Sequence, residues 1–295
     1  MTLGFRSKPK GTLVPVGGNE DKQKGLHVLR RICSLPDGGT KIVEVIPTAS
    51  SEPKETADQY LQAFSRIGIP TVRVMNIQSR AEAHDEALVE RIREADVVFM
   101  TGGDQLRLAH LLGGTPVCEA IKRHYHNGGV VAGTSAGAAA MSSTMIFEGE
   151  AGVVHKGNVR MTPGLGLIET AVVDTHFVAR GRFTRLIEVV AGNPGYVGMG
   201  VGEDTGVIIR DGHLLEVFGG GVVVIIDGHH LQYSNISAIE MGAPIAAEHI
   251  VLHTLVEGCG YDLDEQRFIP PKGTKETVKA AKDAKDTKTA KEATP

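Results

Sequence analysis

The sequence contains no tryptophan, and all its aromatic residues together make up only 4% of 295 residues. Proteins that hold sugars, single-stranded nucleic acid or quaternary amines usually do so on aromatic rings. This scarcity argues against those binding classes. The chain also lacks an apolar run of about 18 residues, the length that a membrane-spanning helix requires, so we expect no membrane partner.

Cysteine is scarce as well, with Cys33, Cys118 and Cys259 each alone among apolar residues or glycines. Three isolated cysteines give no disulfide framework. We therefore expect buried, reduced thiols in a cytoplasmic protein. The first eleven residues carry three basic side chains with no apolar segment behind them, so they lack the pattern of a secretory signal.

The net charge of -4 argues against wholesale nucleic-acid binding, and it is unevenly distributed. From residue 272 onward seven lysines and four acidic residues give +3, whereas residues 1–271 carry -7. The tail has no large apolar residue beyond Val278, so we predict a disordered or weakly helical segment over 272–295. We divide the rest into an N-terminal arm over 1–10 and a single domain over 11–271.

Glycine is abundant, with 37 residues, and many of these separate short apolar runs from amphipathic stretches. Apolar strands alternating with helices are typical of a parallel sheet covered on both faces. The pattern predicts an α/β fold with a doubly wound, mostly parallel sheet flanked by helices. The expected strands cover 12–16, 41–47, 71–75 and 96–101, and the expected helices cover 26–35, 53–67, 81–95 and 106–112.

The pattern changes after residue 195, where strand-like runs follow one another without helices. Asp211-Gly212 joins the run 207–210 to the run 213–218, and Asp-Gly between strands is a strong hairpin signal. Three consecutive glycines then lead into the run 222–226. We predict an antiparallel C-terminal extension on the edge of the main sheet, continuing through residues 250–256.

The sharpest motif is Gly133-Thr134-Ser135-Ala136-Gly137, between a buried strand and small, helix-forming residues. This Gly-x-Ser-x-Gly pattern is typical of a nucleophile elbow, in which a strained turn lifts the serine above the sheet. We predict that Ser135 is a nucleophile and that the Ala136 N–H, at the new helix N-terminus, is an oxyanion donor. A plain turn that packs a helix on a strand is the alternative.

A second glycine turn, Thr101-Gly102-Gly103-Asp104-Gln105, also follows a buried strand and precedes a helix. Loops at the carboxyl ends of the strands surround the site of an open α/β sheet. We expect the Gly103 N–H to be a second oxyanion donor and Gln105 to bind substrate. An ordinary strand-to-helix turn is the alternative.

A nucleophilic serine needs a base, and His176 is the strongest candidate among twelve histidines. It closes the strand-like run 171–176, and in an extended strand its side chain lies on the same face as Asp174. Glu203 follows a glycine-spaced strand and is the predicted acid that orients His176 and stabilises its imidazolium. A structural ion pair is the alternative for Asp174 and His176.

We expect no metal and no cofactor. The pairs His124/His126 and His229/His230 have no nearby carboxylate or cysteine to complete a ligand set. The glycines of the segment 198–202 imitate a dinucleotide fingerprint, but no helix follows them.

Three arginines, at positions 180, 182 and 185, follow His176. On a helix that begins near Gly181, Arg182 and Arg185 lie on one face and repel each other unless anions meet them. The residues 186–190 are too apolar for a wholly exposed helix. We predict that the three arginines bind substrate carboxylates; a solvated basic face is the alternative.

Together these motifs resemble the cyanophycinase family of serine peptidases, which also contains aspartyl dipeptidase. The resemblance covers roughly residues 11–270 and includes the segment Gly-Gly-Asn-Glu-Asp at 17–21 as well as the motifs above. It implies a fold like that of class I glutamine amidotransferases and a homodimer. It also implies hydrolysis of cyanophycin, a poly-aspartate that carries arginine on each β-carboxyl, to β-Asp-Arg dipeptides.

The resemblance assigns Ser135 as nucleophile, His176 as base and Glu203 as orienting acid. Family members usually have glutamine where this chain has Thr175, and the shorter side chain loses an amide contact. Acidic groups of the domain are expected to meet the guanidinium groups of the substrate. The substrate pocket that the resemblance implies consists of Gln105, Asp174, Thr175, Arg180, Arg182 and Arg185.

Three alternative functions stay open at this point. An aspartyl dipeptidase needs a small, closed pocket for one aspartate, which three arginines exceed. An α/β-hydrolase esterase has the chain order serine, acid, histidine and requires residues such as Asp227 and His253. A ligand-binding protein of amidotransferase-like fold has the pocket without a reactive serine.

Overall fold

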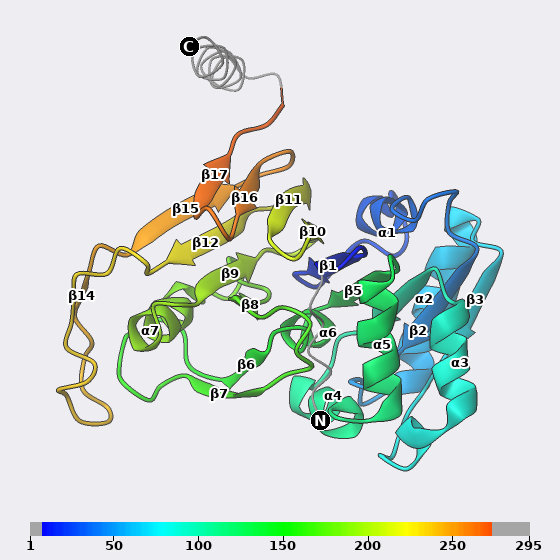
Figure 1. Cartoon of the computed structure of the whole chain (residues 1–295), viewed down its shortest axis with the longest axis horizontal. Coiled ribbons are helices and arrows are strands. Elements are labelled where there is room, and N and C mark those ends of the chain that lie inside the picture. The colour runs from blue at the N-terminus through cyan, green and yellow to red at the C-terminus, as the bar shows by residue number, and fades with distance from the viewer. Residues whose placement is uncertain (1–7, 273–295) are drawn as a thin grey trace, which may run out of the picture.

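The computed structural model describes residues 8–272. The predicted tail, except for Lys272, and most of the predicted N-terminal arm lie outside the described residues. Two sheets dominate the described part, one of nine strands and one of four (Figure 1). This arrangement confirms the predicted α/β fold, with a large, mostly parallel sheet, flanking helices and antiparallel strands toward the C-terminus.

The nine-stranded main sheet has the order β17-β16-β11-β10-β1-β5-β4-β2-β3. Its strands from β1 to β3 in this order are all parallel to their neighbours. They are short and apolar, and two of them, β5 and β4, are buried along their whole length, as a sheet covered on both faces requires. The parallel strands are β1 (Thr12–Val16), β5 (Val130–Thr134), β4 (Val97–Met100), β2 (Ile42–Ile46) and β3 (Thr71–Val74).

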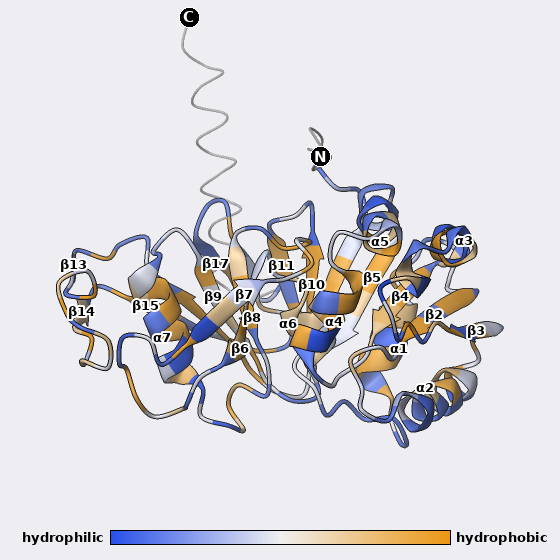
Figure 2. Cartoon of the chain, turned by 90° about the horizontal axis from the view of Figure 1, so that it is seen from below, coloured by the Kyte–Doolittle hydropathy of each residue, from blue (hydrophilic) through white to orange (hydrophobic). Residues whose placement is uncertain are grey.

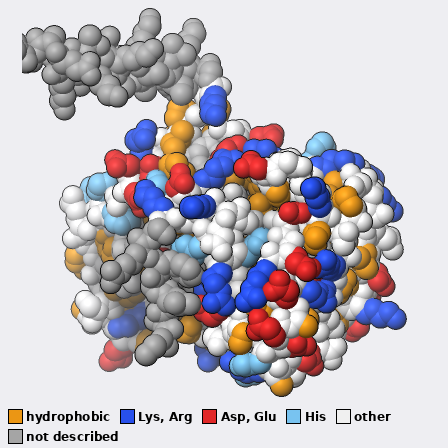
Figure 3. All heavy atoms as spheres, turned by 45° about the vertical axis from the view of Figure 1, so that its right-hand side comes forward, with side chains coloured by type: hydrophobic (Ala, Val, Ile, Leu, Met, Phe, Trp, Pro, Cys, Tyr) orange, Lys and Arg blue, Asp and Glu red, His pale blue; other side chains and the backbone are white. Residues whose placement is uncertain are grey.

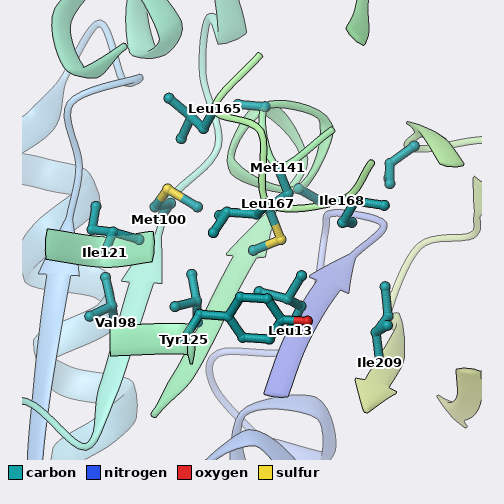
Figure 4. Packing of buried hydrophobic residues seen from close by; sticks show 14 of the residues in the cluster. Leu13, Val98, Met100, Ile121, Tyr125, Met141, Leu165, Leu167, Ile168 and Ile209 are labelled. Carbon is teal, nitrogen blue, oxygen red and sulfur yellow. The ribbon is translucent and has the colours of Figure 1, made fainter. Parts of the chain in front are cut away.

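Two groups of helices cover the two faces of the parallel strands. Because successive residues of a strand point to opposite faces, Val14 and Val16 pack with α1 (His27–Cys33) and α2 (Pro53–Ile67), while Leu13 packs with the opposite group. Figure 4 shows this second core around Leu13, Val98 and Ile121. The opposite group comprises α3 (Glu86–Glu94), α4 (Gln105–Leu112) and α5 (Pro116–His126).

The predicted helix over 81–95 is divided in two. A 3-10 turn, η1 (Glu82–His84), ends at Asp85, whose extended backbone and side-chain hydrogen bond to the Ala87 N–H cap the start of α3. An aspartate in this position satisfies an N–H group that has no partner within the helix. Figure 2 shows the apolar strands inside and hydrophilic residues on the outer turns of these helices.

The Asp211-Gly212 hairpin is confirmed, because β10 (Thr205–Arg210) pairs antiparallel with β11 (Leu214–Gly219). The strand β10 also pairs antiparallel with β1, which extends the main sheet beyond its parallel part. Two short strands, β16 (Gly260–Asp262) and β17 (Arg267–Ile269), complete that side.

The prediction for the remaining C-terminal strands was wrong in its placement. β12 (Val223–Asp227) and β15 (Val251–Leu255) do not extend the main sheet but form the second sheet, in the order β15-β12-β9-β8. Every residue of β12 is buried, so this strand needs cover on both faces and neighbours on both sides. It pairs with β9 (Val197–Val201), which runs parallel to β8 (Ala171–Asp174).

The helix α7 (Phe183–Gly192) packs on the second sheet through an apolar cluster that includes Leu186, Val190 and Ile226. Two separate pairs of antiparallel strands lie beside α7. One is formed by β6 (Thr144–Glu148) and β7 (Arg160–Pro163), and the other by β13 (Tyr233–Ser234) and β14 (Ala247–Glu248).

The three cysteines are buried and free, as predicted. None of the helices in residues 8–272 is long and apolar enough to cross a membrane. Acidic and basic side chains are interspersed over the face seen in Figure 3.

Candidate active site

The carboxyl ends of four strands, two from each sheet, meet at one place. Ser135 follows β5, and residues 17–20 follow the neighbouring β1 in the main sheet. His176 lies two residues beyond β8, and Glu203 lies two residues beyond β9 in the second sheet. The two sheets touch here so closely that a Cβ on Gly17 would lie 1.9 Å from the Gly202 carbonyl oxygen. Only glycine allows this approach of the two backbones.

Ser135 occupies a strained elbow. Its φ of 51° and ψ of -111° lie outside the regions favoured by side-chain-bearing residues. The short helix α6 (Ala136–Ala139) starts directly after it, so the Ala136 N–H belongs to the first turn beside the hydroxyl. The Ser135 Oγ lies 3.0 Å from the His176 Nε2. The turn predicted from the Gly-x-Ser-x-Gly motif therefore presents a hydroxyl that is already paired with an imidazole.

His176 links the hydroxyl to a carboxylate. Its Nδ1 lies 2.6 Å from the Glu203 Oε1, and the Asn19 side-chain amide donates to the Glu203 Oε2 over 3.0 Å. The hydrogen bond from His176, and next the one from Asn19, hold the pKa of Glu203 below its usual range. An ionised Glu203 fixes the proton of neutral His176 on Nδ1 and leaves Nε2 to accept from Ser135.

The strand that precedes His176 is shorter than predicted. β8 ends at Asp174, and His176 has a φ of 49°. Its N–H donates to the Gly17 carbonyl oxygen over 2.8 Å, which takes the backbone out of the strand. The same-face geometry expected for Asp174 and His176 is therefore wrong, because His176 contacts Ser135 and Glu203 whereas Asp174 contacts arginines.

Asp174 supplies the anion that the arginine block needs. The Arg182 Nη1 donates to the Asp174 Oδ1 over 3.1 Å and to the Thr175 carbonyl oxygen over 2.8 Å. The Arg185 Nε lies 3.2 Å from the Asp174 Oδ2, without the alignment of a hydrogen bond. Burial raises the pKa of Asp174, and the charges of Arg185 and Arg182 act in the opposite direction. The negative charge that was predicted to come from a substrate carboxylate is thus supplied by Asp174 for two of the three arginines, Arg182 and Arg185.

The other predicted site residues make contacts outside this cluster. The Gln105 side-chain amide donates to the Ile146 carbonyl oxygen over 3.1 Å, and Thr175 is buried. Arg180 is exposed, and its N–H donates to the His176 carbonyl oxygen. Gly103 has a φ of 141°, and a Cβ there would lie 2.0 Å from the Ala49 carbonyl oxygen. The roles of these residues in binding substrate or an oxyanion stay predictions.

The esterase alternative has no support in the geometry. Asp227 accepts hydrogen bonds from the His229 ring and the Tyr261 hydroxyl. The His253 ring packs against Tyr261, with 5.4 Å between the ring centroids. The imidazole within hydrogen-bond distance of the Ser135 hydroxyl belongs to His176, which precedes Glu203 in the chain, and this geometry favours the predicted order serine, histidine, acid.

Two further residues of this site have no role predicted from the sequence. Asn19 contacts Glu203, and the Glu20 carboxylate accepts a hydrogen bond from Thr134, the residue before Ser135. Both belong to the segment 17–21, to which the resemblance assigns no function. Their position at the carboxyl end of the strand beside β5 is the signal that would have placed them near Ser135.

Comparisons with known proteins identify the family that the chain resembles. The sequence matches Peptidase family S51 over residues 13–217. It is 36% identical to a cyanophycinase from Geminocystis herdmanii over 255 residues, which span 86% of this chain and 94% of that protein. It is 35% identical to a cyanophycinase from Nostoc sp. over 263 residues, 88% of each chain.

The fold is also found among solved structures. That of a peptidase from an acI-B1 Actinobacterium matches with a TM-score of 0.64 and 22% sequence identity, over 88% of this chain and 100% of that one. At this identity the likeness concerns the fold. The match to the family covers more than half of the chain, and the relatives correspond to it over nearly their whole length. The chain therefore belongs to peptidase family S51 and is a serine peptidase.

Proposed function

We propose that this chain is a cytoplasmic, homodimeric exopeptidase that hydrolyses cyanophycin to β-Asp-Arg dipeptides through an acyl-enzyme on Ser135. The observation that supports it best is the row of hydrogen bonds from Ser135 through His176 to Glu203, with distances of 3.0 Å and 2.6 Å. The cyanophycinases that resemble the chain over most of its length supply the substrate class.

In the proposed reaction the His176 Nε2 takes the proton of the Ser135 hydroxyl while the Oγ attacks a backbone carbonyl carbon of the polymer. Glu203 stabilises the imidazolium that forms. The Ala136 and Gly103 N–H groups bind the oxyanion. His176 then gives the proton to the leaving amine, the amide bond breaks, and a water activated by His176 hydrolyses the ester.

Binding of the substrate is proposed to divide the arginines by role. Arg180 is exposed and meets a substrate carboxylate directly. Arg182 and Arg185 are held by Asp174 and shape the pocket wall. The arrangement lets one guanidinium group bind and release substrate while the paired ones stay in place.

The function is tested by incubating the purified full chain with cyanophycin granules and identifying the released products by mass spectrometry. We expect β-Asp-Arg from the unmodified chain and none from Ser135→Ala. Intact granules together with cleavage of Asp-X dipeptides would indicate an aspartyl dipeptidase. Failure of a fluorophosphonate to label Ser135 in the folded protein would indicate a ligand-binding protein.

The division of the arginines gives a matched pair of variants. We expect Arg180→Ala to raise KM for soluble cyanophycin by about 10-fold, the size of one charge-assisted hydrogen bond, with an unchanged Tm. Arg185→Ala is expected to lower the unfolding free energy by about 2 kcal/mol, because Asp174 then keeps its burial with one partner fewer. Kinetics and thermal unfolding measure both effects. A Tm loss in Arg180→Ala, or a stable Arg185→Ala, would contradict the division.

A further inference from the structure

The last residue of β1 and the segment that follows it contact every part of the catalytic row. The Val16 carbonyl oxygen accepts from the Ser135 N–H over 3.0 Å, and the Gly17 carbonyl oxygen accepts from the His176 N–H over 2.8 Å. The Asn19 side chain holds Glu203. Residues 16–20, which we call the β1 strip, thus join the nucleophile, the base and the acid across the two sheets.

Glu20 ends this strip and points away from solvent. Its side chain is 0% exposed. The Thr134 Oγ1 donates to the Glu20 Oε2 over 2.6 Å, the Tyr60 hydroxyl donates to the Oε1, and the Lys22 Nζ lies 3.2 Å from the same oxygen. A buried carboxylate is costly unless such partners meet it, and three groups from three segments do so here.

The partner that matters for chemistry is Thr134. It is the last residue of β5 and immediately precedes Ser135, whose φ of 51° the surrounding structure must maintain. The Thr134 side chain is anchored on Glu20, and the Ser135 N–H is anchored on Val16. The β1 strip therefore holds both residues of the Thr134–Ser135 peptide bond. This bond immediately precedes the backbone angle φ of Ser135, which helps to set the direction of the hydroxyl.

We propose that Glu20 is a positioning residue, which acts through Thr134 to hold the Ser135 Oγ in line with the His176 Nε2. The inference deepens the proposed function and rests on it only in using Ser135 as the nucleophile. A displacement of about 1 Å at a reacting atom lowers rates by about 100-fold. Loss of the Glu20 anchor is therefore visible in the reactivity of Ser135.

The test compares Glu20→Gln with Glu44→Gln, a matched control. Glu44 also has a 0% exposed side chain and pairs with an arginine, Arg91, but it lies within β2, away from the elbow. We expect a lower Tm for both variants, because each loses a buried, paired carboxylate. Only Glu20→Gln is expected to lower kcat and the rate of Ser135 labelling by a fluorophosphonate, each by about 10- to 100-fold with KM unchanged. Labelling at the unmodified rate in folded Glu20→Gln would overturn the proposal.

Variants of Thr134 give a second, independent reading. Thr134→Val removes the hydroxyl at constant volume and is expected to slow labelling as Glu20→Gln does, while Thr134→Ser restores most of the rate. Fast labelling of folded Thr134→Val would overturn the proposal even if Glu20→Gln does not fold. Because labelling needs no polymer, a chain that labels but leaves cyanophycin intact refutes the proposed function and not the role of Glu20.

Discussion

Replacement of His176 by alanine is expected to lower kcat for cyanophycin by about 10⁵-fold. The variant loses the group that is proposed to take the proton from Ser135, and it leaves Glu203 without the hydrogen bond on which its lowered pKa mainly depends. Residual hydrolysis comes from the oxyanion donors and from binding alone. Single-turnover assays with the purified variant measure the loss, and circular dichroism verifies that it folds.

His253→Ala is the control, because that histidine is the base that an α/β-hydrolase order would require. Its ring packs on Tyr261 and Phe268. We expect it to keep kcat within about 3-fold, as a partly exposed residue remote from the nucleophile does. Activity that survives His176→Ala and disappears in His253→Ala would refute the triad.

The pH profile provides a check on the acid of this row. The hydrogen bonds from His176 and Asn19 hold the pKa of Glu203 below the usual range of a glutamate, so its carboxylate stays ionised at and above that range. No loss of kcat from protonation of Glu203 is therefore expected there, and a step of kcat in that range that moves in Asn19→Ala would contradict this assignment.

Gly18→Ala is expected to reduce kcat by about 100- to 1000-fold although it replaces none of the proposed reactive groups. Gly18 has a φ of +96°, and a Cβ at this position would lie 2.5 Å from the Cε1 and Nε2 of His176. The added methyl group drives the ring from its position beside the Ser135 Oγ. Steady-state kinetics at a temperature where the variant is folded measure the effect.

Gly68→Ala is the control that shows how much of the effect comes from backbone strain and how much from the collision with His176. Gly68 has nearly the same φ, +95°, but a Cβ there meets nothing within 4 Å. Both alanines cost about 1–2 kcal/mol of stability because of the left-handed backbone. We expect only Gly18→Ala to lose activity. Equal losses in the two variants would show that strain, and not the imidazole, is responsible.

The sequence predicted the parts of this site that depend on local pattern. The elbow at Ser135 follows from two glycines between a buried strand and a helix, and this order of elements is present. The helix over 53–67 has the predicted bounds because Pro53 and Gly68 mark its two ends. These features need only neighbouring residues to form.

Features that depend on contacts between residues far apart in the sequence could not be predicted from local patterns. The sequence places β12 after a glycine triplet but does not show that its complete burial takes it into a second sheet beside β9. It shows three arginines but not that Asp174 turns inward to meet two of them. The partnership of Glu20 with Thr134 spans 114 residues and depends on the pairing of β1 with β5.

The proposed catalytic row crosses the junction of the two sheets, with Ser135 after a strand of the main sheet and His176 and Glu203 after strands of the other. Neither sheet alone carries all three residues. The second sheet includes β12 and β15, so its pairing is complete only when residues up to 255 have been made. A chain shortened before residue 251 therefore lacks one strand of the sheet that carries His176 and Glu203, even though all three residues of the row are present in its sequence.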